Sequence, residues 1–119
     1  MAEVMGPQEK SAFRTAWNRL AKAVHQNAVK KGWHDRPRED GTVIALIHSE
    51  LSEGLEALRR GNPPSKKIPE FSHLEEEYAD VVIRIMDDAE AKGLDVGGAI
   101  EAKMAYNEGR GYRHGRKEF

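Results

Sequence analysis

The chain has 119 residues, of which 39% are hydrophobic and 33% charged, and this composition fits one globular domain spanning residues 1–119. It contains no cysteine, which excludes disulfides, thiolate zinc sites and cysteine nucleophiles. The formal net charge of -1 gives no general attraction to a nucleic-acid polymer or a membrane, and no apolar run approaches the ~18 residues that span a bilayer. The first seven residues lack the basic start and apolar core of a signal peptide, so we expect a cytoplasmic protein.

A first helix is predicted over about residues 8–31, with Gly32 as its C-terminal stop. Its apolar stripe consists of Phe13, Trp17, Leu20 and Val24. The following residues, 33–40, hold Pro37 and many charges, which oppose regular structure and predict a loop. Trp33 in this loop is either a packing aromatic or a stacking surface for a base.

A second helix is predicted over about residues 40–60, closed by Gly61 and followed by two prolines. Its apolar stripe consists of Ile44, Ile47, Leu51, Leu55 and Leu58. Glu50 and Glu53 lie on a neighbouring face, and that face also carries Val43, Leu46 and Ala57. Because a buried charge is costly without a partner, two acids among apolar positions are informative.

A third helix is predicted over about residues 72–92, because Ser72 with Glu75 matches a capping box and Gly93 supplies a stop. The residues before it, 62–71, are interpreted as a connector, with a mobile flap as the alternative. The helix carries the apolar stripe Leu74, Tyr78, Val81, Ile85 and Ala89, with Val82, Ile83 and Met86 beside it. So wide an apolar surface predicts contacts on two sides, the second being another subunit.

A fourth helix is predicted over about residues 95–108, starting at the N-cap Asp95. Val96, Ile100, Lys103 and Asn107 share one face, which begins apolar and turns polar, and this pattern indicates a pocket at the polar end. The tail, residues 109–119, is too rich in glycine and basic residues for a helix and is either a phosphate-binding segment or a frayed terminus. No strand pattern competes with the four helices, so the predicted fold is all-α.

Two acidic pairs carry the functional prediction. Glu50 with Glu53 and Glu77 with Asp80 are each spaced i, i+3, which places both carboxylates of a pair on one helical face. If the two helices pack together, four carboxylates converge, and Mg²⁺ or Mn²⁺ would relieve their repulsion. Asp87, seven residues after Asp80, is expected to extend this acidic row. The alternative for each pair is a solvated face with ordinary ion pairs.

The basic tail and the polar end of the fourth helix indicate what such a metal would act on. Residues 103–119 hold five Lys or Arg and two acids, and Lys103 and Asn107 can hydrogen-bond a ring. A nucleoside triphosphate combines phosphates with such a ring. The chain has no Gly-x-x-x-x-Gly-Lys-[Ser/Thr] loop, so it is not a P-loop enzyme. Trp33, Asn107 and Tyr112 are the candidates to line the base pocket.

The combination of motifs resembles the MazG-like all-α nucleoside triphosphate pyrophosphohydrolases over about residues 10–117. The resemblance rests on both acidic pairs, on Lys103-Met104-Ala105-Tyr106-Asn107 and on Tyr112-Arg113-His114-Gly115. It implies a four-helix bundle that assembles as a homodimer or a dimer of dimers. It also implies Mg²⁺-dependent cleavage of a (d)NTP to a (d)NMP and pyrophosphate, with house-cleaning of non-canonical nucleotides as an expected role.

The resemblance also assigns roles to individual residues. Glu50, Glu53, Glu77 and Asp80 would be the catalytic metal ligands, with Mn²⁺ as a substitute for Mg²⁺. Lys103 and Asn107 match residues near the substrate, and Arg110 or Arg113 would meet its phosphates.

One departure from the family pattern keeps other functions open. The first family motif often begins with an additional Glu, and Ser49 stands there in this chain. Glu76 precedes Glu77 but is expected to point to a different face. The alternatives are a non-catalytic nucleotide- or Mg²⁺-binding helical module, a structural interaction protein, and a phosphohydrolase that cuts another bond. The preferred base and sugar stay open.

Overall fold

The computed structural model describes residues 5–119, apart from the side chains at positions 10, 11 and 114. The prediction that the chain starts without a signal peptide rests partly on residues 1–4, which lie outside the described residues. The helices are α1 (Pro7–Lys30), α2 (Asp40–Arg59), α3 (His73–Ala91), α4 (Val96–Glu108) and the single turn α5 (Arg113–Arg116). Over residues 5–119 there is no β-strand, and the all-α prediction is confirmed. None of the described helices is long and apolar enough to cross a membrane.

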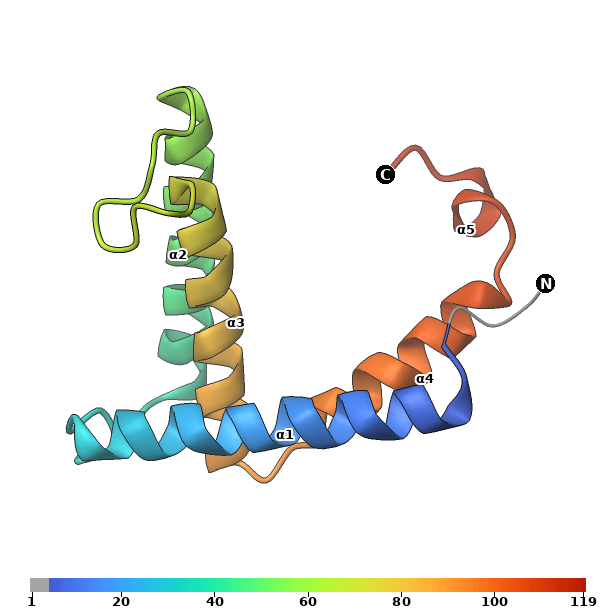
Figure 1. The fold of residues 1–119 in the computed structure, drawn as a ribbon, viewed down its shortest axis with the longest axis horizontal. Helices are drawn as coiled ribbons and strands as arrows, with labels where there is room; N and C mark the ends of the chain where they lie inside the picture. The colour runs from blue at the N-terminus through green and yellow to red at the C-terminus, as the bar shows by residue number, and fades with distance from the viewer. Residues whose placement is uncertain (1–4) are drawn as a thin grey trace.

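The helices are arranged in two arms (Figure 1). One arm consists of α2 and α3, and the other consists of α4 with the N-terminal half of α1. α2 and α3 pack side by side in one arm, and α1 runs across the base of this arm in contact with α3. α4 packs along the N-terminal half of α1, on the side away from α2. The four long helices do not close into one bundle within the single chain (Figure 1), so the four-helix bundle and its assembly with other copies stay predictions.

The predicted helix ends are confirmed to within one or two residues, and two caps show why. Ser72 Oγ accepts a hydrogen bond from the backbone N–H of Glu75 at 3.1 Å, and Glu75 Oε1 accepts one from the N–H of Ser72 at 3.0 Å. Asp95 caps α4 by accepting from the N–H of Gly98 at 2.8 Å. Gly93 follows α3 with a φ of 69°, which a glycine adopts without strain.

The predicted apolar stripe of α2 faces outward in the single chain. Three of its leucines, Leu51, Leu55 and Leu58, and also Ile44 are exposed. The neighbouring face packs on α3 instead, and its buried members are Val43, Gly54 and Ala57. The core is small and also includes Met86 and Ala89 of α3. The face of α2 that carries Glu50 and Glu53 therefore packs on α3. The apolar stripe of α2 is exposed in the single chain.

The tail differs from its prediction. Residues 113–116 were expected to be non-helical, but they form the single turn α5. Hydrogen bonds from Arg116 N to Tyr112 O and from Lys117 N to Arg113 O, each 2.9 Å, close this turn. Arg113, Gly115 and Arg116 have positive φ, so the turn is no ordinary right-handed helix, and Gly115 is the residue that accepts such a backbone most easily.

Candidate metal centre

A buried glycine lets α2 and α3 approach closely at the acidic pairs. A Cβ built at Gly54 would lie 3.2 Å from Leu74 Cδ1 and 3.6 Å from Glu77 Cβ. Even an alanine here would require the Leu74 side chain to shift by a few tenths of an ångström, so the contact between the two helices is close at this level. Because Glu53 is next to Gly54 in the chain and Glu50 is one turn earlier, the close approach brings both to the face of α3 that carries Glu77.

Three of the predicted carboxylates, those of Glu50, Glu53 and Asp80, lie around the fourth, that of Glu77. Glu50, Glu77 and Asp80 each offer a donor oxygen, and these atoms lie within 4.8 Å of one another. Glu53 and Glu77 form a second such group together with His73. Glu77 itself is only 3% exposed. Its Oε1 lies 3.1 Å from His73 Nε2, whereas its Oε2 is buried and has no hydrogen-bond partner among the described residues.

The electrostatics of this cluster show that its negative charges are only partly compensated. Burial raises the pKa of Glu77 to about 7; further contributions come from Glu50, to which the protonated form of Glu77 can donate a hydrogen bond, and from the charges of Glu50, Glu53 and Asp80. Burial also raises the pKa of Asp80, together with the charge of Glu50. A bound divalent cation would remove this repulsion and give the orphan oxygen of Glu77 a partner. The four carboxylates offer hard oxygen donors, which suit Mg²⁺ or Mn²⁺, and His73 adds one nitrogen beside Glu53 and Glu77.

Two basic residues beside the cluster were not predicted as site residues. Arg84 donates to Glu50 Oε1 from Nε at 3.1 Å and from a terminal nitrogen at 3.0 Å. The charges of Arg84 and Lys67 both lower the pKa of Asp80 and so partly offset its rise. A sequence signal for Arg84 exists, because it is the one base between residues 75 and 90 and lies seven residues after Glu77, two helical turns along the same face.

The loop between α2 and α3 is fixed by a buried serine. Ser65 Oγ accepts from the N–H groups of Lys67 and Ile68, at 3.2 and 3.0 Å, and donates to Glu76 Oε1 at 2.7 Å. Of the two alternatives for residues 62–71, these bonds favour a fixed connector over a mobile flap. They also explain the position of Glu76, which binds this loop and is not one of the grouped ligands, although its charge contributes to the raised pKa of Asp80.

A cavity of about 770 Å³ lies beside the carboxylates. It is walled by α1, the connector 31–39, α2, the loop between α2 and α3, and α3, and its volume is within the range of about 300–1,000 Å³ that suits small ligands. Its apolar lining includes Leu20, Val24, Val43, Leu46 and Ile83. Its polar lining includes Glu50, Asp80, Lys67, Arg84 and Arg38. The cavity is therefore lined by apolar side chains, carboxylates and basic groups together.

Of the predicted substrate residues, the structure brings one to this cavity. Trp33 lines it, with 68% of its surface exposed. Within the described part of the chain, no residue of α4 or of the tail lines it. The remaining five predicted substrate residues lie on α4 and in the tail, outside the cavity. They are Lys103, Asn107, Arg110, Tyr112 and Arg113.

The surroundings of these residues differ from the prediction of a pocket on α4. Lys103 and Asn107 are exposed and do not continue a core-facing stripe. Lys103 Nζ lies 4.5 Å from the centre of the Tyr106 ring, and the Arg110 guanidinium lies 5.5 Å from the same centre. Likewise the Arg113 guanidinium lies 5.6 Å from the centre of the Tyr112 ring. These basic groups rest on aromatic faces of their own segment.

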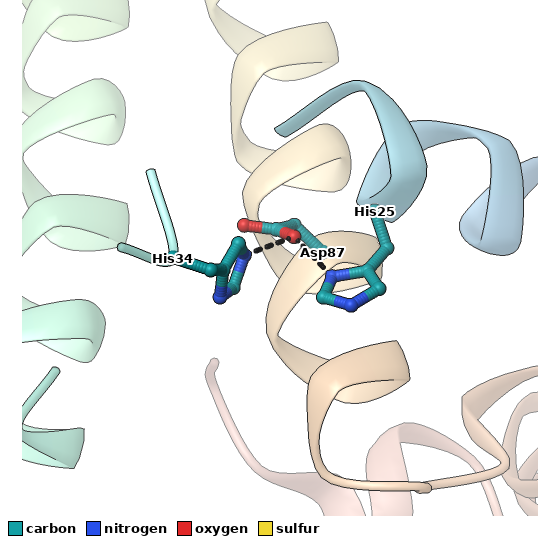
Figure 2. Close-up of side chains that lie close together, drawn as sticks. All are labelled: His25, His34 and Asp87. Carbon is teal, nitrogen blue, oxygen red and sulfur yellow. Dashed lines mark hydrogen bonds and ion pairs between the residues drawn. The ribbon is translucent and has the colours of Figure 1, made fainter. Parts of the chain in front are cut away.

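Contrary to the prediction, Asp87 does not extend the acidic row. It is buried among His25, His34 and Arg38, on the next turns of α3 beyond Asp80 (Figure 2). Neither histidine was predicted to belong to a site, because they are nine residues apart and only the fold brings both to Asp87.

Comparison of the chain with protein-family models, with curated proteins and with solved structures found no match. The family resemblance therefore stays a prediction from the motifs.

Proposed function

We propose that the protein is a cytoplasmic, Mg²⁺-dependent nucleoside triphosphate pyrophosphohydrolase of the MazG-like type, which converts a (d)NTP and water to a (d)NMP and pyrophosphate. The observation that carries this proposal is the grouping of three carboxylates around that of the buried Glu77, beside an apolar cavity with basic groups in its wall. Acid ligands, basic groups and an apolar pocket are what a metal-bound triphosphate with an attached base requires.

Glu50, Glu53, Glu77 and Asp80 would hold the Mg²⁺ ion, and Mn²⁺ would substitute for it. When bound, the ion supplies charge neutralisation on the phosphate oxygens and activation of water.

The side chains that line the cavity would contribute to substrate binding and to catalysis in different ways. The apolar lining of the cavity excludes water around the nucleoside, and Trp33 offers a face on which a base stacks. Lys67 and Arg84 lie on the acidic side of the cavity, where they stabilise the negative charge that develops on the phosphates. One of the four carboxylates also takes the proton of the attacking water.

A second copy of the chain completes this proposal. The apolar stripe of α2 is exposed to solvent in the single chain, which favours its burial against another copy. The five substrate residues on α4 and in the tail lie outside the cavity of their own chain. A homodimer or a dimer of dimers would cover the stripe and supply α4 and the tail of a neighbour to the site.

The second candidate is a non-catalytic module that binds Mg²⁺ and a nucleotide. The position of Ser49 favours it, because Ser49 Oγ donates to the carbonyl of Leu46 at 2.6 Å. This hydroxyl is thus occupied within α2, and it offers no charge in place of the leading Glu that the family often carries.

The deciding experiment is a product analysis. The purified protein is incubated with a panel of canonical and modified (d)NTPs, with and without Mg²⁺, and the products are separated by ion-exchange chromatography. We expect monophosphate and pyrophosphate in the presence of Mg²⁺ and no turnover in its absence.

Variants connect the activity to the centre. Glu53→Gln and Asp80→Asn should abolish turnover while the helical CD spectrum is unchanged, because each removes one metal-ligating charge. Glu56→Gln is the matched control, since Glu56 lies on the same helix but pairs with Arg59 and Arg60. Diphosphate and orthophosphate as products would overturn the reaction class. Nucleotide binding without turnover would support the second candidate.

A further inference from the structure

A second cluster of metal-ligating side chains lies apart from the four carboxylates. His25 comes from α1, His34 from the connector between α1 and α2, and Asp87 from α3. His25 Nδ1 lies 2.8 Å and His34 Nε2 2.7 Å from the same oxygen of Asp87, Oδ1 (Figure 2). The three donor atoms lie within 4.8 Å of one another. Asp87 is 7% exposed, so the fold commits a buried carboxylate to this place.

The donor set differs in kind from that of the acidic centre. Two imidazole nitrogens with one carboxylate oxygen suit zinc and other first-row transition metals, whereas Mg²⁺ prefers oxygen ligands alone. The two rings meet edge to face, with centroids 4.7 Å apart, and each presents a nitrogen to Asp87. Without a metal, a proton on each of these nitrogens makes a hydrogen bond to Oδ1. A metal ion would bind the same three atoms, and the proton of each neutral ring would then lie on its other nitrogen.

The surroundings supply a supporting contact and an access route. A terminal nitrogen of Arg38 lies 3.4 Å from Asp87 Oδ2, the oxygen that does not face the histidines, and so orients the carboxylate. Asp88 Oδ1, 3.9 Å from Arg38, offsets part of the guanidinium charge. Asp87 lines the cavity of about 770 Å³, and His34 lines a neighbouring cavity of about 390 Å³. A metal ion can therefore reach the cluster from solvent.

We infer that His25, His34 and Asp87 form a transition-metal site of the Zn²⁺ class, separate from the carboxylate centre. Three protein ligands leave at least one coordination position to water or another small ligand. Because the three residues come from three segments, the ion joins α1 and the connector to α3. The bound ion stabilises the wall of the larger cavity that Trp33 and Arg38 line.

The experiment uses Co²⁺ as a spectroscopic probe for Zn²⁺. Wild-type protein should bind Co²⁺ with a visible absorption band, which Zn²⁺ abolishes by displacement, and Zn²⁺ should raise the midpoint of thermal unfolding. His25→Asn and His34→Gln each keep a nitrogen that can donate to Asp87 but remove the imidazole ligand. Both variants should lose the Co²⁺ band and the Zn²⁺-dependent thermal shift while they keep the helical CD spectrum.

Two histidine variants are the controls. His48→Asn changes an exposed residue of α2, and His73→Gln changes the histidine beside Glu77. Both should keep the Co²⁺ band. A band that persists in His25→Asn and His34→Gln, a band lost only in His73→Gln, or no Zn²⁺-displaceable band in the wild type would overturn the inference. If either cluster variant unfolds, NMR of the wild-type protein decides, because Zn²⁺ must shift the ring signals of His25 and His34 and leave those of His48.

Discussion

Arg84 of α3 donates two hydrogen bonds to one oxygen of Glu50 on α2, at 3.1 and 3.0 Å. The pair is partly buried, with 39% of the Arg84 side chain and 16% of the Glu50 side chain exposed. It places a fixed positive charge inside an acidic cluster, and this charge also lowers the pKa of Asp80. Arg84 therefore holds the two acidic helices together when no cation is bound.

This arrangement predicts a coupling between Arg84 and Glu50 that depends on metal. We expect Arg84→Gln to lower the free energy of unfolding of the metal-free protein at pH 8. A double-mutant cycle with Glu50→Gln should give a coupling of about 1 kcal/mol, the size expected for a well-aligned, partly exposed pair. Urea unfolding measures both quantities.

Saturating Mg²⁺ should reduce this coupling, because the ion then shares the charge of Glu50. Arg59→Gln, on the exposed side of α2, serves as the control. A coupling of zero without Mg²⁺ would show that the two hydrogen bonds have no energetic role.

Glu77 gives a pH prediction whose sign follows from its pKa. The pKa rises from an ordinary value of 4.5 to about 7 on folding, so the folded state binds this proton more tightly than the unfolded state. The resulting stabilisation is complete below about pH 4.5 and is lost as the pH rises through about 7. The raised pKa corresponds to about 3 kcal/mol, as an order of magnitude.

Glu77→Gln removes this titration and keeps the shape of the side chain. In the absence of metal at pH 8, the variant should be more stable than the wild type by roughly 1–3 kcal/mol. Mg²⁺ should stabilise the wild type and leave the variant almost unchanged. Urea unfolding between pH 4 and 8, with and without Mg²⁺, tests both statements, with Glu56→Gln as the control. Equal Mg²⁺ stabilisation of wild type and variant would remove Glu77 from the metal centre.

The sequence predicts the helices and the convergence of the acids for local reasons. Caps such as Ser72 and Asp95, together with the helical spacing of apolar residues, are set within a few residues of chain, so the helix ends are confirmed closely. The i, i+3 spacing likewise fixes which carboxylates share a face. The step from two faces to one cluster depends on Gly54, whose missing side chain permits the close approach of α3.

What the sequence does not predict depends on contacts between distant segments. The apolar stripe that contains Leu55 is the strongest periodic signal of α2, yet packing selects the neighbouring face with Val43 and Ala57. Periodicity shows that a face is apolar and does not show whether its own chain or a second chain covers it. The His25–His34–Asp87 cluster has no local signal at all, because its members meet only after α1 crosses α3.

The exposed stripe gives a prediction about assembly. Leu55, in the middle of the stripe, is 53% exposed in the single chain, and Leu55→Glu places a charge there without changing the packed face of α2. If a second copy covers the stripe, the variant should dissociate to monomers while the helical CD spectrum is kept, because an unpaired charge in an interface is costly. Sedimentation velocity measures the mass. Glu56→Leu is a control that adds apolar surface beside the stripe, and it should leave the assembly unchanged. A monomeric wild type would contradict the prediction.

The junction of α1 and α4 gives the last prediction. Asp95 accepts hydrogen bonds from Asn18 at 3.0 Å and from the N–H of Gly98 at 2.8 Å, and it forms an ion pair with Arg14. These contacts, led by the bond from Asn18, lower the pKa of Asp95 to about 2. The folded state therefore favours the charged form, and this stabilisation is present above the ordinary pKa of 3.8 and is lost as the pH falls through about 2.

Asp95→Asn keeps an N-cap for α4 but removes the charge that Arg14 binds. We expect a lower midpoint of thermal unfolding at pH 7 than in the wild type, and a difference that shrinks as the pH falls from about 4 to about 2. Hydrogen exchange should become faster along α4 and stay unchanged along α2, because α4 packs mainly on α1 and has little else to hold it. Asp35→Asn, in the exposed connector, is the control. An unchanged exchange rate along α4 would show that the apolar contacts between α1 and α4 hold this helix without Asp95.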